Sequence, residues 1–440
     1  MASDTVPYSP APVAKKTAKH YGPTVVAQGL ILGIGILTGV LTARLLGPQG
    51  RGEYAAVFVW TTGIAALVGL GINQAIAFHQ GKRSFTPSEL CTAATAIWTI
   101  QSVLSIVVCI LVLHFVLAGY SPLVRHVAVL FAFFTPALIG GGNPQALFQG
   151  SQDLVKFNFL RSLSPSVYCA ALLALFVVQW RSLEAVFGSL AFSYVLAAVV
   201  GCAMAWRAFR PRWKWNRAAI GSLLHFGTRV QTTNLTSYFN QRIDQVILSL
   251  FVPPQQLGFY AVAVSLSTAV AVFPQAAGIV TFSKGSNQNR DDAGATIGTA
   301  FRASLIWLLL SCGGLYVMAH FLIRHVFGVA FDGSILACRI LIPGAFMTGL
   351  NQVLYNGASA LGRPGLPSIA EGLSMLVTAI GLFLLVPHYG YIGAAIVSSI
   401  AYTASFVVML ILAHRYLALN LRLLLFPSLA GASLEHPNDR

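Results

Sequence analysis

Charged side chains are scarce in this sequence, and acids are scarcer than bases. Asp, Glu, Lys and Arg make up 9% of the 440 residues, with 12 acids against 27 Lys and Arg. Soluble globular chains are usually about one-quarter charged, so this composition excludes an ordinary water-soluble domain. The mean hydropathy of +0.74 instead indicates a multi-pass membrane protein.

Motifs for metal binding, disulfide frameworks and nucleotide binding are also missing. The six cysteines form no C-x-x-C pair and lie in or beside apolar segments, which favours packing roles over a zinc site or disulfide framework. The sequence contains no G-x-x-x-x-G-K-[ST] phosphate loop. We therefore expect no metal, no resident cofactor and no self-contained use of ATP.

Apolar stretches long enough to cross a bilayer recur along the chain, and short loops separate them. This pattern predicts an all-α integral membrane protein with twelve transmembrane helices. The predicted spans are 24–46, 54–78, 89–117, 123–147, 157–180, 184–206, 219–252, 256–282, 295–321, 333–358, 365–386 and 391–414.

The positions of the basic residues predict the orientation of these spans. With the N-terminus in the cytoplasm, seventeen of the 27 Lys and Arg residues fall on the cytoplasmic side. The positive-inside rule favours this arrangement, which also places the C-terminus in the cytoplasm. Five basic residues fall outside, namely Arg44, Arg51, Arg125, Arg181 and Arg324.

The most basic stretch is RAFRPRWKWNR at 207–217, in the middle of the chain. Its tryptophans suit the headgroup zone and its cations suit anionic lipid, so we expect it to contact membrane lipid rather than nucleic acid. It divides the predicted protein into regions. These are a cytoplasmic tail (1–22), an N-lobe (23–206), a basic linker (207–218), a C-lobe (219–415) and a second cytoplasmic tail (416–440).

The two predicted lobes share weak internal repeats. Gly52-x-Tyr54-Ala55 corresponds to Gly258-x-Tyr260-Ala261, and two further matches have nearly the same offset, between 205 and 207 residues. Six spans in each unit give both units the same orientation. The repeat therefore predicts two six-helix lobes related by a pseudo-twofold axis along the membrane normal, with a transport pathway between them.

One predicted span, GTRVQTTNLTSYFNQRIDQVILSLFVPP, is unusually polar. At 100° per residue, Arg229, Asn240 and Asp244 fall on one face of a helix, whereas Arg242 lies on another side. Charged side chains at bilayer depth are costly and usually face a partner or a wet cavity. The helix therefore lines a hydrophilic pathway or, alternatively, holds the bundle together through an ion pair.

Several short motifs resemble the polysaccharide transporter family, which contains the Wzx-type oligosaccharide flippases. They are Arg44-Leu-Leu-Gly47-Pro48 with Gly52-x-Tyr54, RIDQVILSLF, and GRPGLPSIAEGLSMLVTAIGLFLLVPHYGYIGAAIVSSIAY. The resemblance extends over nearly the whole chain, residues 20–415, and places it in the multidrug/oligosaccharidyl-lipid/polysaccharide exporter superfamily. It implies a flippase of the bacterial cytoplasmic (inner) membrane rather than an enzyme, which works by alternating access.

The resemblance also implies a cargo, a polyprenyl-diphosphate-linked oligosaccharide, and neighbours in the pathway such as a polysaccharide polymerase or glycosyltransferases. A diphosphate needs cations inside the cavity. The candidate cavity cations at membrane depth are Arg161, Arg229, Arg242, Arg302 and Arg339.

The candidate coupling or gating residues are Asp244, Asn240 and Glu371, through H⁺ or Na⁺. Alternatively, Asp244 forms a permanent salt bridge with an arginine, and Glu371 is a solvated residue at a helix start.

Three other functions compete with this interpretation. A multidrug or cation antiporter would need carboxylates for a cationic cargo, and the first span contains none. A lipid II flippase of the same superfamily generally carries two extra spans. A membrane polysaccharide polymerase or ligase usually has a large extracytoplasmic loop, and every predicted loop on that side is short.

Overall fold

The computed structural model describes residues 14–285, 288–417, 419 and 424–425. Every regular element among them is a helix, which confirms the predicted all-α class. Residues 1–13 of the first predicted tail, and nearly all of the second beyond 417, lie outside the described residues. The first helix already begins at Ala14, within the stretch predicted as a tail.

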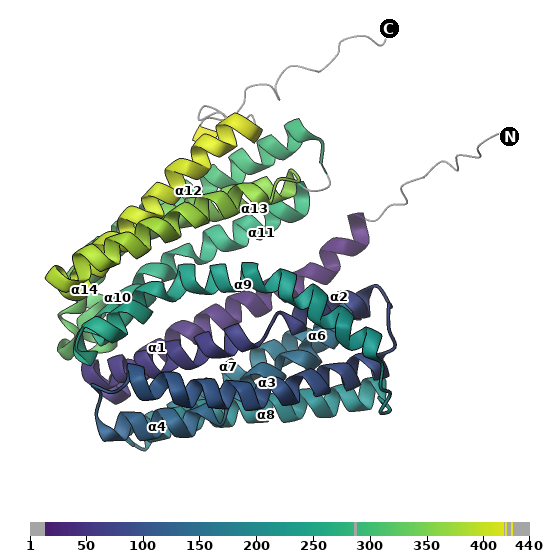
Figure 1. Cartoon of the computed structure of the whole chain (residues 1–440). Helices are drawn as coiled ribbons and strands as arrows, with labels where there is room; N and C mark the ends of the chain where they lie inside the picture. Colours follow the sequence, from purple (N-terminus) through teal and green to yellow (C-terminus); the bar gives the residue numbers. More distant parts are fainter. Residues whose placement is uncertain (1–13, 286–287, 418, 420–423, 426–440) are drawn as a thin grey trace, which may run out of the picture.

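The part of the chain before the basic linker is the N-terminal half, and it comprises eight helices (Figure 1). They are α1 (Ala14–Val68), α2 (Ile72–Gly81), α3 (Pro87–Val116), α4 (Pro122–Ala132), α5 (Thr135–Gly140), α6 (Gly142–Gly150), α7 (Leu154–Val177) and α8 (Leu183–Phe209).

The C-terminal half follows the linker and includes three short non-α helices, of which η2 is a π-helix. Its elements are α9 (Arg217–Phe251), α10 (Pro254–Thr268), η1 (Ala269–Ala271), α11 (Val272–Gly285), α12 (Arg290–Leu322), η2 (Ile323–Phe327), η3 (Val329–Phe331), α13 (Ser334–Ala360) and α14 (Gly365–Leu417).

Eight helices among the described residues are long and apolar enough to cross a membrane, and a ninth forms if α4 through α6 is one bent span. The polar helix α9 is not among them. Two of the eight, α1 and α14, are each interrupted by a glycine at positive φ, Gly47 at 67° and Gly390 at 54°. Glycine adopts this backbone region without steric cost, so the chain can break a helix there.

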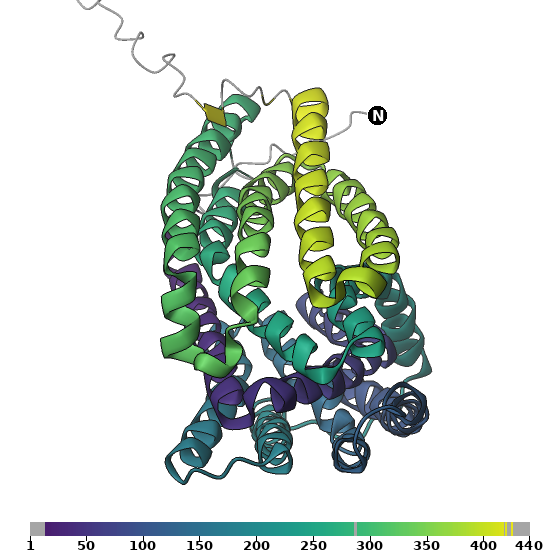
Figure 2. The same ribbon diagram turned by 90° about the vertical axis from the view of Figure 1, so that its left-hand side faces the viewer.

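The helices of the two halves occupy different sides of the molecule. Figure 1 shows the N-terminal half below and α10 to α14 above, with α9 running between them. Figure 2, turned by 90°, shows the same division. Helix α9 is therefore positioned to contact both halves along its length.

Carbonyl groups at the end of α1 explain why α9 carries a buried glutamine. Helix α1 ends at Val68, and the chain turns at Gly71, where φ is 63°. The last carbonyls of a helix have no partner within it and need donors from elsewhere. Gln101 of α3 donates to the Val68 carbonyl at 2.9 Å, and Gln231 of α9 donates to the Ala66 carbonyl at 2.6 Å. Both glutamines are buried, and they satisfy carbonyls that the turn leaves free.

The two halves touch backbone to backbone where α1 crosses α10. A Cβ atom added at Gly52 would lie 1.6 Å from the carbonyl oxygen of Pro254, and one added at Gly258 would lie 1.9 Å from that of Pro48. The contact is reciprocal, because Pro48 and Gly52 are the counterparts of Pro254 and Gly258 in the sequence repeat. Only glycine permits so close an approach of two helices.

This crossing generates a stability prediction. Gly52→Ala and Gly258→Ala each push a methyl group into backbone, where overpacking typically costs about 1–3 kcal/mol or more. We expect a lower thermal unfolding midpoint in detergent for both variants.

Gly33→Ala is the matched control, because Gly33 also lies in α1 but has no atom within 4 Å of an added Cβ. It should leave the midpoint unchanged or slightly higher, since alanine is the better helix former. Equal midpoints for Gly52→Ala, Gly258→Ala and Gly33→Ala would contradict the role of the crossing.

Candidate functional site

A cavity of about 840 Å³ is lined by residues of both halves. Its walls come from α1, α7 and α8 on one side and from α9, α10, α11, α13 and α14 on the other. Many lining side chains are polar, which sets this cavity apart from the apolar surface that faces lipid. Six of them are tyrosines: Tyr54, Tyr168, Tyr194, Tyr260, Tyr355 and Tyr402.

Two arginines line this cavity, Arg51 from α1 and Arg242 from α9. Neither has a carboxylate within 4.0 Å among the described residues, where the ion pairs are Lys156–Asp153, Lys214–Glu89 and Arg324–Asp332. The Nε of Arg51 is buried without a hydrogen-bond partner, while its guanidinium lies 5.2 Å from the centre of the Tyr54 ring. Arg242 contacts Gln245 at 3.4 Å. Both guanidinium groups thus belong to one cavity, one from each half of the chain.

The position of Arg51 corrects the predicted spans at this point. The sequence predicts a loop between the spans 24–46 and 54–78, but α1 resumes its helical path directly after Gly47, so Arg51 belongs to a helix that faces the cavity. The repeat could have indicated it, because Arg51 directly precedes Gly52-x-Tyr54. At the corresponding position of the second unit stands Leu257, so the cation has no counterpart.

Asp244 is buried behind the wall of the cavity rather than on it. Its Oδ2 accepts a hydrogen bond of 2.5 Å from the hydroxyl of Tyr260, and its Oδ1 accepts one of 2.7 Å from the backbone N–H of Gln245. The Tyr260 hydroxyl also lies 3.1 Å from that of Ser398 on α14. Asp244 thus joins α9 to α10 and α14 through a tyrosine that lines the cavity, and no arginine of the described chain forms an ion pair with it.

Asn240 and Glu371 both line the cavity. Glu371 is partly buried in α14, near Tyr355, and makes no hydrogen bond or ion pair with another described residue. It lies six residues after the start of α14 at Gly365, so both interpretations, a coupling group and a solvated residue near a helix start, remain predictions. Among the described lining residues, Glu371 is the one carboxylate, and two guanidinium groups share the cavity with it.

The other four candidate arginines lie outside the lining of this cavity. Arg161 on α7 donates to Gln28 on α1. Arg229 is exposed on α9, and Arg302 donates to Thr299 one turn away on α12 at 3.1 Å. Arg339 lies 5.4 Å from the centre of the Tyr316 ring.

The lining has the chemistry to hold an anion together with a hydroxyl-rich group. Guanidinium groups bind phosphate oxygens through two parallel hydrogen bonds. The side-chain amides of the lining both donate and accept, so they match hydroxyl groups, and tyrosine combines an apolar ring with a polar tip. These amides are Asn240, Gln241, Gln245, Gln275, Asn351 and Gln352.

Comparison with known proteins gives the family. The sequence matches the family described as polysaccharide biosynthesis protein over residues 18–284. A putative O-antigen transporter of Shigella flexneri is 22% identical over 389 residues, which is 81% of this chain and 88% of the transporter. A probable low-salt glycan biosynthesis flippase of Haloferax volcanii, Agl15, is 23% identical over 188 residues, and the alignment spans 42% of this chain and 40% of that flippase.

A solved structure shows the same fold. The lipid II flippase MurJ in its inward closed conformation superposes with a TM-score of 0.73, at 16% identity, over 88% of this chain and 86% of that one. The family match covers more than half of the sequence and confirms the resemblance drawn from its motifs. This chain belongs to the polysaccharide biosynthesis protein family of multi-pass membrane proteins.

Proposed function

We propose that this protein is a flippase that moves a polyprenyl-diphosphate-linked oligosaccharide across the bacterial cytoplasmic membrane. The observation that carries the proposal is the polar cavity, in which Arg51 and Arg242 have no carboxylate partner within the part of the chain that the structure describes. The diphosphate would occupy these guanidinium groups, the sugars would meet the tyrosines and amides, and the polyprenyl tail would remain in lipid. The names of the flippase and transporter relatives agree with this activity.

The charge of the cavity argues against a multidrug or cation antiporter. If these three groups are ionised and Asp244 behind the wall is protonated, Arg51 and Arg242 outweigh Glu371 by one positive charge. A positive cavity concentrates anions and repels cations. A lipid II flippase would carry the same diphosphate, so the glycan itself must be identified by export assays.

We propose further that the chain forms twelve spans in two lobes, 23–206 and 219–415, which the linker 207–218 joins. The breaks at Gly47 and Gly390 would divide α1 and α14 into two spans each. Helices α4 to α6 and α10 to α11 would each form one bent span, and α9 would complete the twelve. The reciprocal contact of Gly52 and Gly258 supports a pseudo-twofold axis between the lobes.

Both termini and the linker should face the cytoplasm. In a protein without its native cysteines, we expect Arg212→Cys to react with a membrane-impermeant maleimide only after spheroplasts are opened. Arg125→Cys, on the predicted external side, should react in intact spheroplasts. Labelling of position 212 from outside would contradict the topology.

The mechanism follows from a cavity shared by two halves. Rocking of one lobe against the other about the glycine crossing would expose the cavity first to the cytoplasm and then to the periplasm. Glycosyltransferases would supply the cargo, and a polysaccharide polymerase would use the exported unit. Asp244 would act as the coupling or gating group, because Tyr260, which donates a hydrogen bond to it, borders the cargo space.

Loss of a cavity arginine should impair export. A hydrogen bond to a charged group contributes about 1.5–3 kcal/mol, so Arg51→Ala and Arg242→Ala should weaken cargo binding by roughly 10- to 150-fold. Arg242→Lys should restore little, since lysine cannot bind phosphate through a bidentate fork. The measurement is glycan export in a flippase-deficient cell at equal membrane abundance.

Arg229→Ala is the matched control, because Arg229 lies on the same helix as Arg242 but outside the cavity. Full export by Arg51→Ala and Arg242→Ala would refute the cargo site. If Arg229→Ala alone impaired export, the result would indicate a cargo site at the other end of α9.

Substitution of Asp244 should affect coupling rather than cargo binding. Asp244→Asn keeps an acceptor for the Tyr260 hydroxyl but removes the titratable charge, so the protein should remain folded and membrane-inserted. We expect export to lose its dependence on the ion gradient, or to slow markedly, with unchanged affinity for the cargo. Export by Asp244→Asn with the gradient dependence of the unsubstituted protein would exclude Asp244 as the coupling group.

A further inference from the structure

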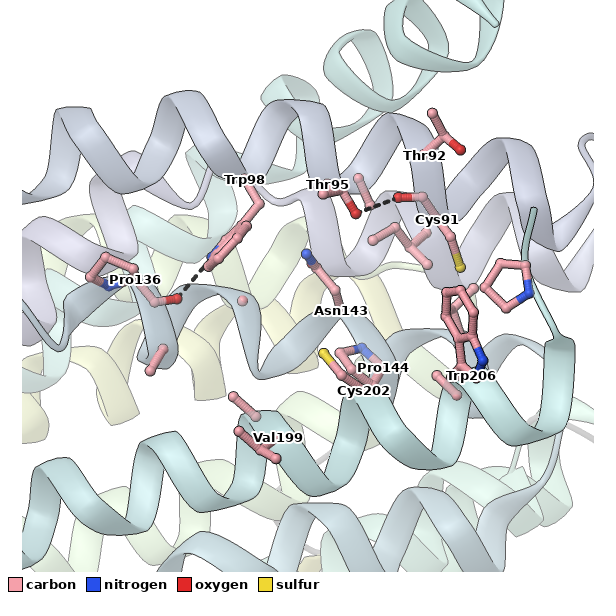
Figure 3. A pocket seen from close by; sticks show the side chains of 18 of the residues that line it. Cys91, Thr92, Thr95, Trp98, Pro136, Asn143, Pro144, Val199, Cys202 and Trp206 are labelled. Carbon is pink, nitrogen blue, oxygen red and sulfur yellow. Dashed lines mark hydrogen bonds between the residues drawn. The ribbon is translucent and has the colours of Figure 1, made fainter. Parts of the chain in front are cut away.

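A second cavity, of about 920 Å³, lies wholly within the N-terminal half. It opens between α3 and α8, with α5 and α6 at its back and residues 211–213 of the basic linker at one end. Figure 3 shows its walls, with Trp98, Val199, Cys202 and Trp206 among the labelled side chains. Almost all of the lining is apolar, in contrast to the cavity that both halves share.

We propose that this cavity binds one anionic phospholipid of the cytoplasmic leaflet, with its acyl chains inside and its headgroup phosphate on Arg212. The proposal does not depend on the cargo of the flippase. It rests on the composition of the walls, the length of the cavity and the charge at its mouth.

The walls offer an acyl chain mostly hydrocarbon, and the side-chain amide of Asn143 (Figure 3) is a polar exception that makes no hydrogen bond with another described residue. The indole N–H of Trp98 is already donated to the Pro136 carbonyl at 2.9 Å, and the Thr95 hydroxyl to the Cys91 carbonyl at 2.8 Å. Apolar cavities that satisfy their own polar groups take up apolar ligands in preference to water. Acyl chains of the bilayer already lie in hydrocarbon, so their retention in this cavity depends on packing against its walls and on the headgroup contact rather than on removal from water.

The length of the cavity fits one leaflet. Its lining residues on α8 extend from Val195 to Trp206, which at 1.5 Å per residue is about 16 Å along the helix. The hydrocarbon core of a bilayer is about 30 Å thick, so the cavity spans roughly half of it. This depth matches the acyl chains of a phospholipid in a single leaflet, whereas a polyprenyl chain is much longer than that.

The mouth of the cavity has the features of a headgroup site. Trp206 and Trp213 are 66% and 71% exposed beside it, as expected of indoles at the membrane interface. Arg212 lies in the lining, and its exposed guanidinium forms no ion pair with another described residue. Four more cations flank it in the linker, namely Arg207, Arg210, Lys214 and Arg217.

The linker is fixed over this mouth by hydrogen bonds to the start of α3. The backbone N–H of Arg212 donates to the Ser88 hydroxyl at 3.1 Å, and that of Lys214 donates to the Thr92 hydroxyl at 3.0 Å. The Lys214 ammonium also pairs with Glu89 at 3.0 Å. The backbone at Arg212 is thus fixed beside the mouth, so the linker itself need not be ordered when an anionic headgroup binds. The bound lipid would in turn fasten the linker that joins the two halves.

Native mass spectrometry of the full-length protein tests the proposal. The protein, purified in detergent, is supplied with equal amounts of phosphatidylglycerol and phosphatidylcholine of identical acyl chains. We expect one tightly retained phosphatidylglycerol, and a loss of about fivefold in its retention for Arg212→Ala, the effect of one surface cation on anionic lipid. Arg125→Ala, which removes an exposed cation of α4, is the matched charge control and should retain the lipid.

Variants that fill the cavity test whether lipid retention requires the acyl-chain site or only electrostatic attraction to the basic linker. Val199→Trp and Cys202→Phe both enlarge side chains in the lining of α8 and should abolish retention, whereas Leu310→Trp, at a 71% exposed position of α12, should not. Equal retention of the two lipids, or full retention by both filled variants, would overturn the proposal. Displacement of phosphatidylglycerol by an equimolar polyprenyl phosphate would overturn the assignment of the occupant. If a filled variant does not fold, the Arg212→Ala and lipid-choice measurements still decide the outcome.

Discussion

The contact of α1 with α10 is the constraint on which the rest of the structure depends. Gly52 and Gly258 let two backbones approach more closely than any side chain would allow. The same two motifs place Tyr54 and Tyr260 two residues farther along, and both tyrosines line the shared cavity. The glycines thus determine how near the halves lie at this point, and the tyrosines after them form part of the wall that results.

Much of the architecture could be predicted from the sequence, because the hydropathy of a segment and the close backbone approach that glycine permits both depend on short stretches of residues. Low charge and long apolar runs indicated a multi-pass helical protein, and the matched glycine motifs indicated a link between distant segments. The location of Arg51 could not be predicted in this way. A charged, glycine-rich stretch normally indicates a loop, yet the single residue Gly47 makes the whole turn, and the helix resumes before Arg51.

The candidate site on α9 was only partly predictable, for a reason that lies in helix geometry. A helical wheel gives the direction of a side chain but not its depth in the membrane. Arg229 and Asp244 share a face and lie about 22 Å apart along the axis, yet neither belongs to the cavity lining, whereas Arg242 on another side of the helix does. The partner helix also decides what a polar residue does. Gln231 satisfies carbonyls at the end of α1, whereas Arg242 faces the cavity, and no periodicity in α9 distinguishes these roles.

The charges of the cavity break the symmetry that the repeat creates. At the offset of the glycine motifs, the counterpart of Arg51 is Leu257 and that of Arg242 is Ile36, so neither cation is repeated. A cavity built from two equivalent units would present the same groups to both ends of its cargo. In this cavity, α1 supplies Arg51, α9 supplies Arg242, and Glu371 is the acid of the described lining. The charged groups are therefore distributed unequally around the cavity. The proposed cargo, a lipid-linked sugar, has a charged end and a neutral end, so this asymmetry would favour one bound orientation, while the repeated glycine contact would let both proposed lobes move alike.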